Sequence, residues 1–304
     1  MLVLAGCNAS KEEAKPNDSK QTTTTEQKYP LKIKDANGEM VEIKQQPEKV
    51  VSLIPSNTEI LYALGVDDKV VGVSDNDNYP KEVSEKEKIG GIEFNLEKII
   101  SLKPDLVLSH GSVSESAAAG LQQLKDVGIT VVTIPEAENF EETYDVIAQV
   151  GVIMNKSEQA KNIITEMKNK VTEIQDKVAN IEEQRSAYVE ISDEPEIYTA
   201  GKGTFIQEMF DMLNIKNSAT NTGWYQTSSE TIIKENPDVI LVMYDYVPDI
   251  VEKVKKRTGF QTISAVKNNR VVQISEDEIS RTGPRLTKGL ENLAKAVYPE
   301  VFNE

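Results

Sequence analysis

Residues 95–108 read NLEKIISLKPDLVL, and residues 228–241 read SSETIIKENPDVIL. Both stretches place a glutamate two residues after a polar capping residue, follow it with an Ile-Ile pair, and end with Pro-Asp before an apolar run. Each copy predicts a short helix that leads into a buried strand. Other helix–loop–strand units share the general pattern, but the matched Ile-Ile and Pro-Asp positions favour a duplication. Solenoid repeats recur about every 20–50 residues. The two copies here are much farther apart in the sequence, which predicts two similar lobes.

The chain around the two copies alternates short apolar runs with amphipathic segments, which is typical of α/β layers around a mostly parallel sheet. Residues 56–59 read SNTE, which predicts a helix that begins with a capping box and ends at Gly65. The apolar runs predict strands at residues 50–54, 70–73, 106–108, 129–132 and 186–191.

Residues 157–183 predict one long helix, because apolar side chains recur there every three or four positions. A coiled-coil seam has a similar stripe, but α/β units on both sides favour a brace between lobes, roughly 40 Å long at about 1.5 Å per residue. We therefore predict an α/β fold of two Rossmann-like lobes bridged by a single long helix. The lobes are assigned to residues 29–155 and 184–304, the bridge to residues 156–183, and a closing helix begins near Pro284. The apolar stripe consists of Ala160, Ile163, Met167, Val171, Ile174, Val178 and Ile181.

The amino-terminal segment carries the single cysteine of the chain in the sequence LAGC at residues 4–7. A small residue before a cysteine resembles a bacterial lipobox, and the polar residues that follow offer no core in which to bury a cysteine. We expect Cys7 to be lipidated and residues 1–28 to form a lipobox and a disordered tether. This predicts anchorage at the outer face of a bacterial cell membrane of the Gram-positive type. A complete signal peptide has a basic start and a longer apolar run, so the chain start is expected to be either trimmed or misassigned.

The composition excludes several classes of function. Lys and Arg total 34 against 50 for Asp and Glu, a net charge of −16, so we expect no nucleic-acid partner. One cysteine and one histidine allow no internal disulfide and no zinc site built from several such ligands. The catalytic sequences GxSxG, GxGxxG and HExxH and a Walker loop are absent, which predicts a protein that is not an enzyme. A carboxylate pair stays open as an acid–base site.

Five stretches are informative together: KVVSLIPSNTE at 49–59, Tyr79-Pro80, LKPDLVL at 102–108, YTAGK at 198–202 and RTGPRL at 281–286. They resemble the cobalamin, siderophore and haem branch of the periplasmic binding proteins, and the similarity extends over about residues 46 to 302. Within this branch the resemblance is closest to the cobalamin-binding proteins. It implies a monomeric substrate-binding component of an ABC importer, with no resident cofactor. Such a protein captures a cobalt corrinoid between its lobes and delivers it to a permease dimer with its ATPase subunits.

The resemblance assigns Glu97 and Glu230 to docking onto arginines of the permease dimer. Both glutamates also fall in the first turn of a predicted helix, where the helix dipole favours a negative charge whatever its role. The duplication places one glutamate on each lobe, which suits a two-point contact and makes a poor catalytic dyad.

The ligand cleft is expected at the loops that follow the carboxyl ends of the strands. Trp224 lies in a glycine-flanked polar loop, at the position where the cobalamin-binding proteins have a tryptophan that stacks on the ligand. Asn76 stands where those proteins have an aromatic residue, and Gly91 or Ile92 stands where they have another tryptophan, so the family is better defined than the ligand. The candidate ligand-binding residues are Ser56, Asn76, Tyr79, His110, Tyr198, Trp224, Tyr225, Tyr244, Tyr246 and Arg281.

Two candidates leave the ligand open. His110 at a strand end is either an axial ligand to cobalt or iron or, as we favour, a neutral polar residue of the lining. Arg281 is expected to pair with a phosphate or an amide of the ligand. A ferric siderophore requires clustered basic residues, and only Arg281 and Lys202 are available; haem requires an axial ligand, for which His110 and the tyrosines qualify. A surface sensor or adhesin on the same fold is a further alternative.

Overall fold

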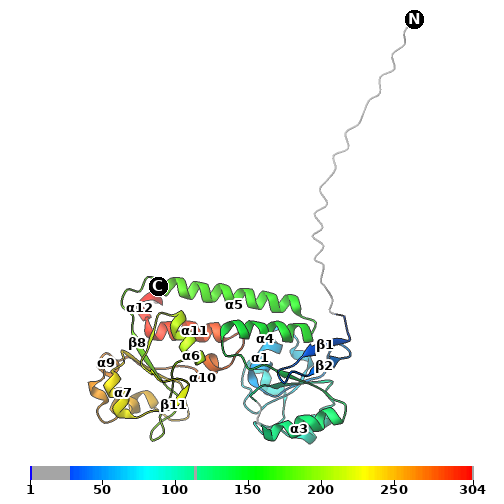
Figure 1. The fold of residues 1–304 in the computed structure, drawn as a ribbon, viewed down its shortest axis with the longest axis horizontal. Coiled ribbons are helices and arrows are strands. Elements are labelled where there is room, and N and C mark those ends of the chain that lie inside the picture. Colours follow the sequence, from blue (N-terminus) through cyan, green and yellow to red (C-terminus); the bar gives the residue numbers. More distant parts are fainter. Residues whose placement is uncertain (2–27, 113–114, 303–304) are drawn as a thin grey trace.

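Two α/β lobes lie side by side beneath one long helix, α5 (Ser157–Val178) (Figure 1). The computed structural model describes Met1, residues 28–112 and residues 115–302, so Cys7 and residues 8–27 of the predicted tether lie outside the described residues. The predicted fold class, two lobes with parallel sheets and a long connecting helix, is confirmed. Among the described helices, none combines the length and the apolar character needed to cross a membrane.

The first lobe is built on a five-stranded parallel sheet in the order β5-β4-β3-β6-β7. Helices α2 and α3 cover one face of this sheet, and α1 and α4 cover the other. An antiparallel hairpin, β1–β2, precedes the sheet in the chain. The elements are β1 (Leu31–Lys34), β2 (Met40–Ile43), β3 (Val50–Ser52), α1 (Pro55–Ala63), η1 (Asp67–Lys69), β4 (Val70–Val73), η2 (Lys81–Glu85), β5 (Glu87–Lys88), α2 (Leu96–Leu102), β6 (Leu106–His110), α3 (Glu115–Asp126), β7 (Thr130–Ile134) and α4 (Phe140–Ile153).

The second lobe has a four-stranded parallel sheet in the order β10-β8-β12-β13 and a small antiparallel pair, β9 with β11. Its elements are β8 (Ser186–Glu190), β9 (Tyr198–Ala200), α6 (Phe205–Met212), β10 (Lys216–Asn217), β11 (Trp224–Gln226), α7 (Ser229–Glu235), β12 (Val239–Val242), α8 (Ile250–Lys256), η3 (Phe260–Thr262), α9 (Ser264–Lys267), β13 (Val271–Gln273), α10 (Glu276–Ser280), α11 (Leu286–Val297) and α12 (Pro299–Phe302).

The two copies of the repeat fold into the same local structure. The Asn95 side chain accepts a hydrogen bond from the N–H of Lys98, and the Ser228 side chain accepts one from Thr231, so α2 and α7 begin with equivalent caps. Both helices have seven residues and end at a residue in the left-handed conformation. Such a cap directs the chain away from the helix axis and into the following strand.

The Pro-Asp pair of each copy has a shared structural function. The Asp105 carboxylate accepts the backbone N–H groups of Glu48 and Lys49, directly before β3, at 2.9 and 3.1 Å. The Asp238 carboxylate accepts the N–H of Ser186, the first residue of β8, at 2.9 Å. Each aspartate therefore fixes the start of the strand that neighbours its own in the parallel sheet.

The predicted capping box at residues 56–59 is wrong. Helix α1 begins one residue earlier, at Pro55, whose fixed φ suits a first helical position, and no side chain caps it. The four residues are instead buried inside the helix. Glu59 does not reach back to the helix start, because its carboxylate is engaged by two arginines of the second lobe.

Helix α5 packs on α4 of the first lobe and on α11 of the second. Five residues of the predicted stripe, Ala160, Met167, Val171, Ile174 and Val178, are buried there. The helix ends at Val178, five residues before the expected boundary, and Ile181 closes a turn on the Val178 carbonyl. One hydrophobic core runs from the first lobe beneath α5 into the second, and each lobe has a further core on its far side.

Helices α10 and α11 meet at very short range. Gly289 of α11 lies against the backbone carbonyl of Glu278 in α10, where a Cβ atom would sit far inside van der Waals contact. Glu278 also accepts hydrogen bonds from Lys288 and Asn292 of α11. This contact sets the position of α10, and α10 lines part of a cavity between the lobes.

Candidate ligand-binding site

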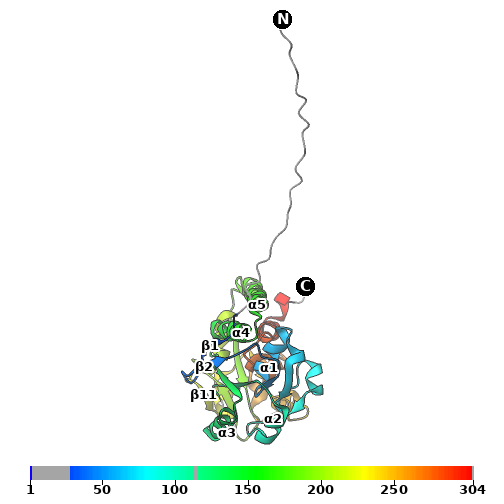
Figure 2. The ribbon, with the colours of Figure 1, turned by 90° about the vertical axis from the view of Figure 1, so that its right-hand side faces the viewer.

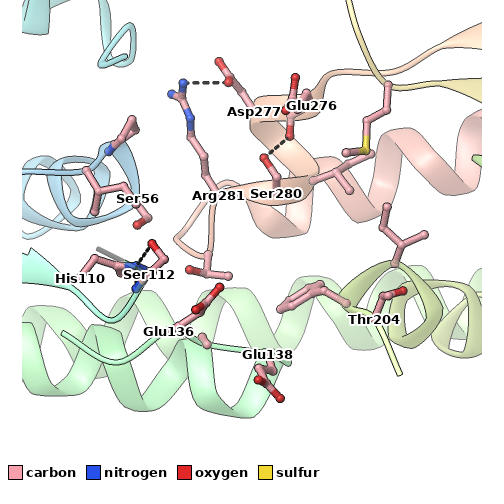
Figure 3. A pocket seen from close by; sticks show the side chains of 18 of the residues that line it. Ser56, His110, Ser112, Glu136, Glu138, Thr204, Glu276, Asp277, Ser280 and Arg281 are labelled. Atoms are coloured by element: carbon pink, nitrogen blue, oxygen red, sulfur yellow. Dashed lines mark hydrogen bonds and ion pairs between the residues drawn. The ribbon is translucent and has the colours of Figure 1, made fainter. Parts of the chain in front are cut away.

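A cavity of about 640 Å³ lies between the two lobes (Figure 3). The first lobe contributes the residues that follow the carboxyl ends of β3, β4, β6 and β7, as expected for parallel sheets. The second lobe contributes the start of α6, Trp224 of β11, Met243 after β12, and α10 with the residues after it. A second cavity of about 520 Å³ shares Met243, Glu276 and Asp277 with the first and extends along the second lobe.

Half of the predicted ligand-binding residues lie together in the cleft. Ser56, Asn76 and His110 line it from the first lobe, and Trp224 and Arg281 line it from the second. These residues come from loops and strand ends that are far apart in the sequence. The other five, which are all tyrosines, lie outside the lining of this cavity.

Trp224 presents an aromatic surface at the mouth of the cleft. Its strand, β11, pairs with β9 so that Trp224 stands opposite Ala200, and 55% of the residue is exposed. An exposed tryptophan held on a short strand pair is suited to contact a large apolar ligand face.

Tyr244 lines the second cavity and Tyr246 lines neither, so ligand contact by these two residues stays a prediction. Tyr244 is buried, and its hydroxyl donates to the Glu190 carboxylate at 2.6 Å. Arg257 binds both oxygens of the same carboxylate, at 2.7 and 2.8 Å. Burial, and then the hydrogen bond to Glu190 and the charge of that carboxylate, raise the pKa of Tyr244. Tyr246 stacks on Tyr244 with ring centroids 4.9 Å apart, its hydroxyl accepts the backbone N–H of Asp193 at 3.0 Å, and the residue is largely exposed.

The remaining three tyrosines are not among the residues that line either cavity. Tyr79 is partly exposed, and the Arg285 guanidinium lies 4.0 Å above its ring. Tyr198 is partly exposed on β9, opposite Gln226, and Tyr225 is half-buried on β11 beside it. For these residues, ligand contact stays a prediction.

The cleft lining is acidic, which the sequence reasoning missed. Glu136 and Glu138 follow β7, and Glu276 and Asp277 begin α10, so four carboxylates line the cavity (Figure 3). Partial burial, and then the neighbouring Asp277 and Asp245 carboxylates, raise the pKa of Glu276. The rule that selected the first-lobe loops would also have selected these positions, since both groups follow the carboxyl end of a parallel strand.

Arg281 is the cationic lining residue in the described part of the cleft, and its guanidinium is already engaged. One terminal nitrogen contacts Glu59 at 3.1 Å and the Asn78 side chain at 2.7 Å. The other contacts the Asn76 carbonyl at 3.1 Å and Asp277 at 2.7 Å. A ligand phosphate would therefore have to replace one of these partners.

Arg285, which is not among the predicted ligand-binding residues, completes the same set of contacts. Its guanidinium binds both oxygens of Glu59, at 2.6 and 2.8 Å, while Asn78 donates to Asp277 at 2.8 Å. These contacts join the first lobe to the second, and we call them the interlobe network. Its members are Glu59, Asn76 and Asn78 of the first lobe and Asp277, Arg281 and Arg285 of the second.

Glu97 and Glu230 are both exposed, in the first turns of α2 and α7. These helices pack on the far-side cores of their own lobes, away from α5. Figure 1 shows α7 and Figure 2 shows α2 on the side of the molecule opposite α5. The two carboxylates are therefore available to solvent on the same general side.

Residues 50–278 match a family model described as "Periplasmic binding protein". The chain belongs to the periplasmic binding protein family. This periplasmic binding protein is 46% identical over its whole length to a Bacillus subtilis (strain 168) protein described as "Uncharacterized ABC transporter substrate-binding lipoprotein YvrC", of which it covers 95%. It is also 30% identical, over 78% of its length, to the "Vitamin B12-binding protein" of Vibrio parahaemolyticus, of which it covers 85%.

A solved structure of a similar protein has the same fold. A Staphylococcus epidermidis protein described as "a possible an iron-binding (periplasmic solute-binding) protein" superposes with a TM-score of 0.76 at 41% identity. The match covers 84% of this periplasmic binding protein and 100% of the other chain. Membership of the family makes the chain a substrate-binding protein and not an enzyme.

Proposed function

We propose that this periplasmic binding protein is the lipid-anchored substrate-binding component of an ABC importer, and that it captures a cobalt corrinoid such as cobalamin. The Bacillus subtilis relative, described as an ABC transporter substrate-binding lipoprotein, supports the first part. The Vibrio parahaemolyticus relative, described as vitamin B12-binding, supports the second. Cys7 in the sequence LAGC is the proposed lipid attachment site at the outer face of the membrane.

The acidic cleft is the observation that carries the choice of ligand. Four carboxylates line it, and the guanidinium of Arg281 is engaged by Glu59 and Asp277. Ferric siderophores are commonly polyanionic and haem carries two propionates, so both would bring like charges into a partly desolvated space. The amide side chains of a corrinoid are neutral, and their N–H groups are suitable donors to the carboxylates. Trp224 adds an aromatic surface for the macrocycle.

A ligand panel tests this proposal. Purified protein is titrated with cyanocobalamin, dicyanocobinamide, a ferric tricatecholate siderophore, ferric citrate and haemin, and both heat and tryptophan fluorescence are recorded. Since Trp224 is the single tryptophan of the chain, its quenching reports on the cleft alone. We expect quenching and saturable heat with a corrinoid. Binding of a ferric siderophore or haemin without binding of either corrinoid would refute the choice of ligand and leave the family intact.

A ferric siderophore is the second candidate, because the Staphylococcus epidermidis structure with 41% identity is described as possibly iron-binding. The same panel separates the two candidates. Substitution of the acidic lining sharpens the comparison: Glu136→Gln with Glu138→Gln removes two negative charges from the cleft. These substitutions are expected to weaken corrinoid binding, and they would strengthen the binding of an anionic ferric ligand.

Glu97 and Glu230 are proposed to dock on the permease, one from each lobe. Their exposure on α2 and α7 is compatible with this role. Glu97→Arg combined with Glu230→Arg is expected to abolish ligand uptake by cells and to leave the affinity of the purified protein unchanged, because neither residue lines the cleft. Uptake of radiolabelled ligand and calorimetry measure the two quantities separately.

The matched control has the same change of charge on the opposite side of the molecule. Glu158 and Glu166 are exposed on α5, so the double change Glu158→Arg and Glu166→Arg is expected to leave uptake and affinity at the level of the unmodified protein. If both double variants reduced uptake equally, a general effect of charge would explain the loss and the assignment of the docking residues would be wrong.

A further inference from the structure

His110 is the single histidine of the chain, and it ends β6 at the wall of the cleft (Figure 3). Only 6% of the residue is exposed. Its ring is held in place by Ser112: the Nδ1 atom lies 3.2 Å from the Ser112 backbone N–H and 2.8 Å from the Ser112 hydroxyl oxygen. Both contacts involve Nδ1, and they determine whether the other ring nitrogen, Nε2, carries a proton.

The contact with the backbone N–H fixes the tautomer. A backbone N–H group can only donate, so Nδ1 has to accept with its lone pair. In a neutral imidazole the proton then resides on Nε2. Protonation of Nδ1 would set two N–H groups against each other, and burial also lowers the pKa of His110. The ring is therefore neutral and offers Nε2–H as a donor.

The Nε2–H group has no protein partner among the described residues. Because His110 lines the cavity, this donor is free to pair with a bound molecule. The four carboxylates of the lining can only accept hydrogen bonds from a ligand, whereas His110 donates one. The cleft therefore offers a bound molecule both a hydrogen-bond donor, His110, and hydrogen-bond acceptors, the carboxylates.

We propose that His110 contacts the bound molecule by donating its Nε2–H to a carbonyl oxygen, and that it does not coordinate the metal. This rests on the proposed capture of a corrinoid in the same cleft, where the acceptor is a side-chain amide carbonyl. An axial ligand needs a free lone pair on Nε2, and the proton occupies that position. Cobalt therefore keeps its own axial ligands in the complex.

The tautomer is tested without any ligand. Because the chain has one histidine, protein labelled with ¹⁵N-histidine gives a single pair of ring signals in a long-range ¹H–¹⁵N correlation spectrum. At pH 7.5 we expect the neutral ring with its proton on Nε2. A neutral ring with its proton on Nδ1 would overturn the proposal. The result is independent of ligand identity, so it stands even if no corrinoid binds and the proposed function fails.

The metal contact is tested with diaquocobinamide, whose axial waters are exchangeable. Coordination by an imidazole shifts the visible spectrum of the corrin, whereas binding through amide groups leaves it nearly unchanged. We expect saturable binding by calorimetry with an unchanged spectrum. The spectrum of an imidazole-bound corrinoid would overturn the proposal. Absence of binding by both cyanocobalamin and diaquocobinamide would instead refute the proposed function.

Two substitutions at His110 test the donor. His110→Phe keeps a planar ring without a donor, and it is expected to weaken cyanocobalamin binding about tenfold, since the ligand carbonyl loses its partner. His110→Gln supplies an N–H donor at similar reach, and it is expected to recover most of that loss. Equal affinity of His110→Phe and the unmodified protein would refute the contact. Circular dichroism establishes that both variants fold, and the tautomer measurement needs neither of them.

Discussion

Glu59 is a buried acidic residue of the first lobe, and both of its guanidinium partners come from the second lobe. Arg285 binds its carboxylate with two hydrogen bonds and Arg281 with one. Buried ion pairs of this kind add little net stability when both partners are present, but removal of one partner leaves an uncompensated charge. The geometry of the cleft wall therefore depends on a residue that does not line the cleft.

Glu59→Gln is expected to lower the free energy of unfolding by about 3 kcal/mol, because Arg281 and Arg285 then lose their shared counter-charge. Urea unfolding followed by circular dichroism measures the change. The control is Glu141→Gln, which breaks an exposed ion pair with Lys168 and should cost less than about 1 kcal/mol. Similar effects of the two substitutions would show that the interlobe network does not contribute to stability.

The pH dependence of stability should report on His110. Burial lowers its pKa below the ordinary value of 6.5, so the unfolded chain binds a proton before the folded protein does. By linkage, the free energy of unfolding then falls as the pH decreases below about 6.5, at no more than about 1.4 kcal/mol per pH unit from this group. Urea unfolding between pH 8 and pH 5 is compared with that of His110→Gln, whose curve should fall less in this range. Parallel curves would contradict the lowered pKa.

Helices α2 and α7 match in cap, length and left-handed end, although they lie in different lobes. Their caps can be perturbed independently, since each cap contacts only its own helix. The single core that continues beneath α5 raises the question of whether the two lobes unfold as one unit.

Asn95→Ala and Ser228→Ala are each expected to lower the free energy of unfolding by about 1 kcal/mol, because each removes the acceptor of a first-turn N–H group. The double variant should lose the sum of the two, since the sites share no partner. Ser101→Ala, which removes an exposed hydroxyl from α2, is the control and should have little effect. Two separate transitions in the denaturation curve would show that the lobes unfold independently.

The elements that sequence could predict are those whose local pattern and tertiary contacts agree. The strands follow their apolar runs and the repeat copies follow their caps and Pro-Asp pairs, because these signals are contained within a few residues. The capping box at residues 56–59 failed because Glu59 is used by distant arginines. The acids after β7 and β13 were not singled out, although the rule that cleft residues follow the carboxyl ends of parallel strands covers their positions. The burial of Tyr244 was not predictable, because its partner Glu190 is 54 residues away in the chain.

The two lobes are joined by more than the connecting chain. Helix α5 packs on both lobes, and the interlobe network ties α1 of the first lobe to α10 and the start of α11 of the second. Phe140 of the first lobe adds a backbone hydrogen bond to Glu208 at 3.1 Å and a ring contact with Phe205 at 5.4 Å. The molecule is thus built to keep the cleft nearly the same width with and without a ligand.

Small-angle X-ray scattering tests this rigidity. Addition of a saturating ligand is expected to change the radius of gyration by less than about 1 Å, as in other preorganised binding proteins. Glu59→Gln combined with Arg285→Gln removes the principal interlobe pair, so this variant should show a larger radius without ligand and a larger contraction with it. A contraction of several ångströms in the unmodified protein would contradict the rigid picture.

The close approach of Gly289 to the Glu278 carbonyl makes the rear of the cleft wall sensitive to a single methyl group. A Gly289→Ala change would push α10 away from α11 and move Glu276 and Asp277 together, although no residue that lines the cleft is itself substituted. Substitutions behind the cleft lining can therefore change which ligand fits, in evolution or in protein engineering, while every ligand-contacting residue is retained.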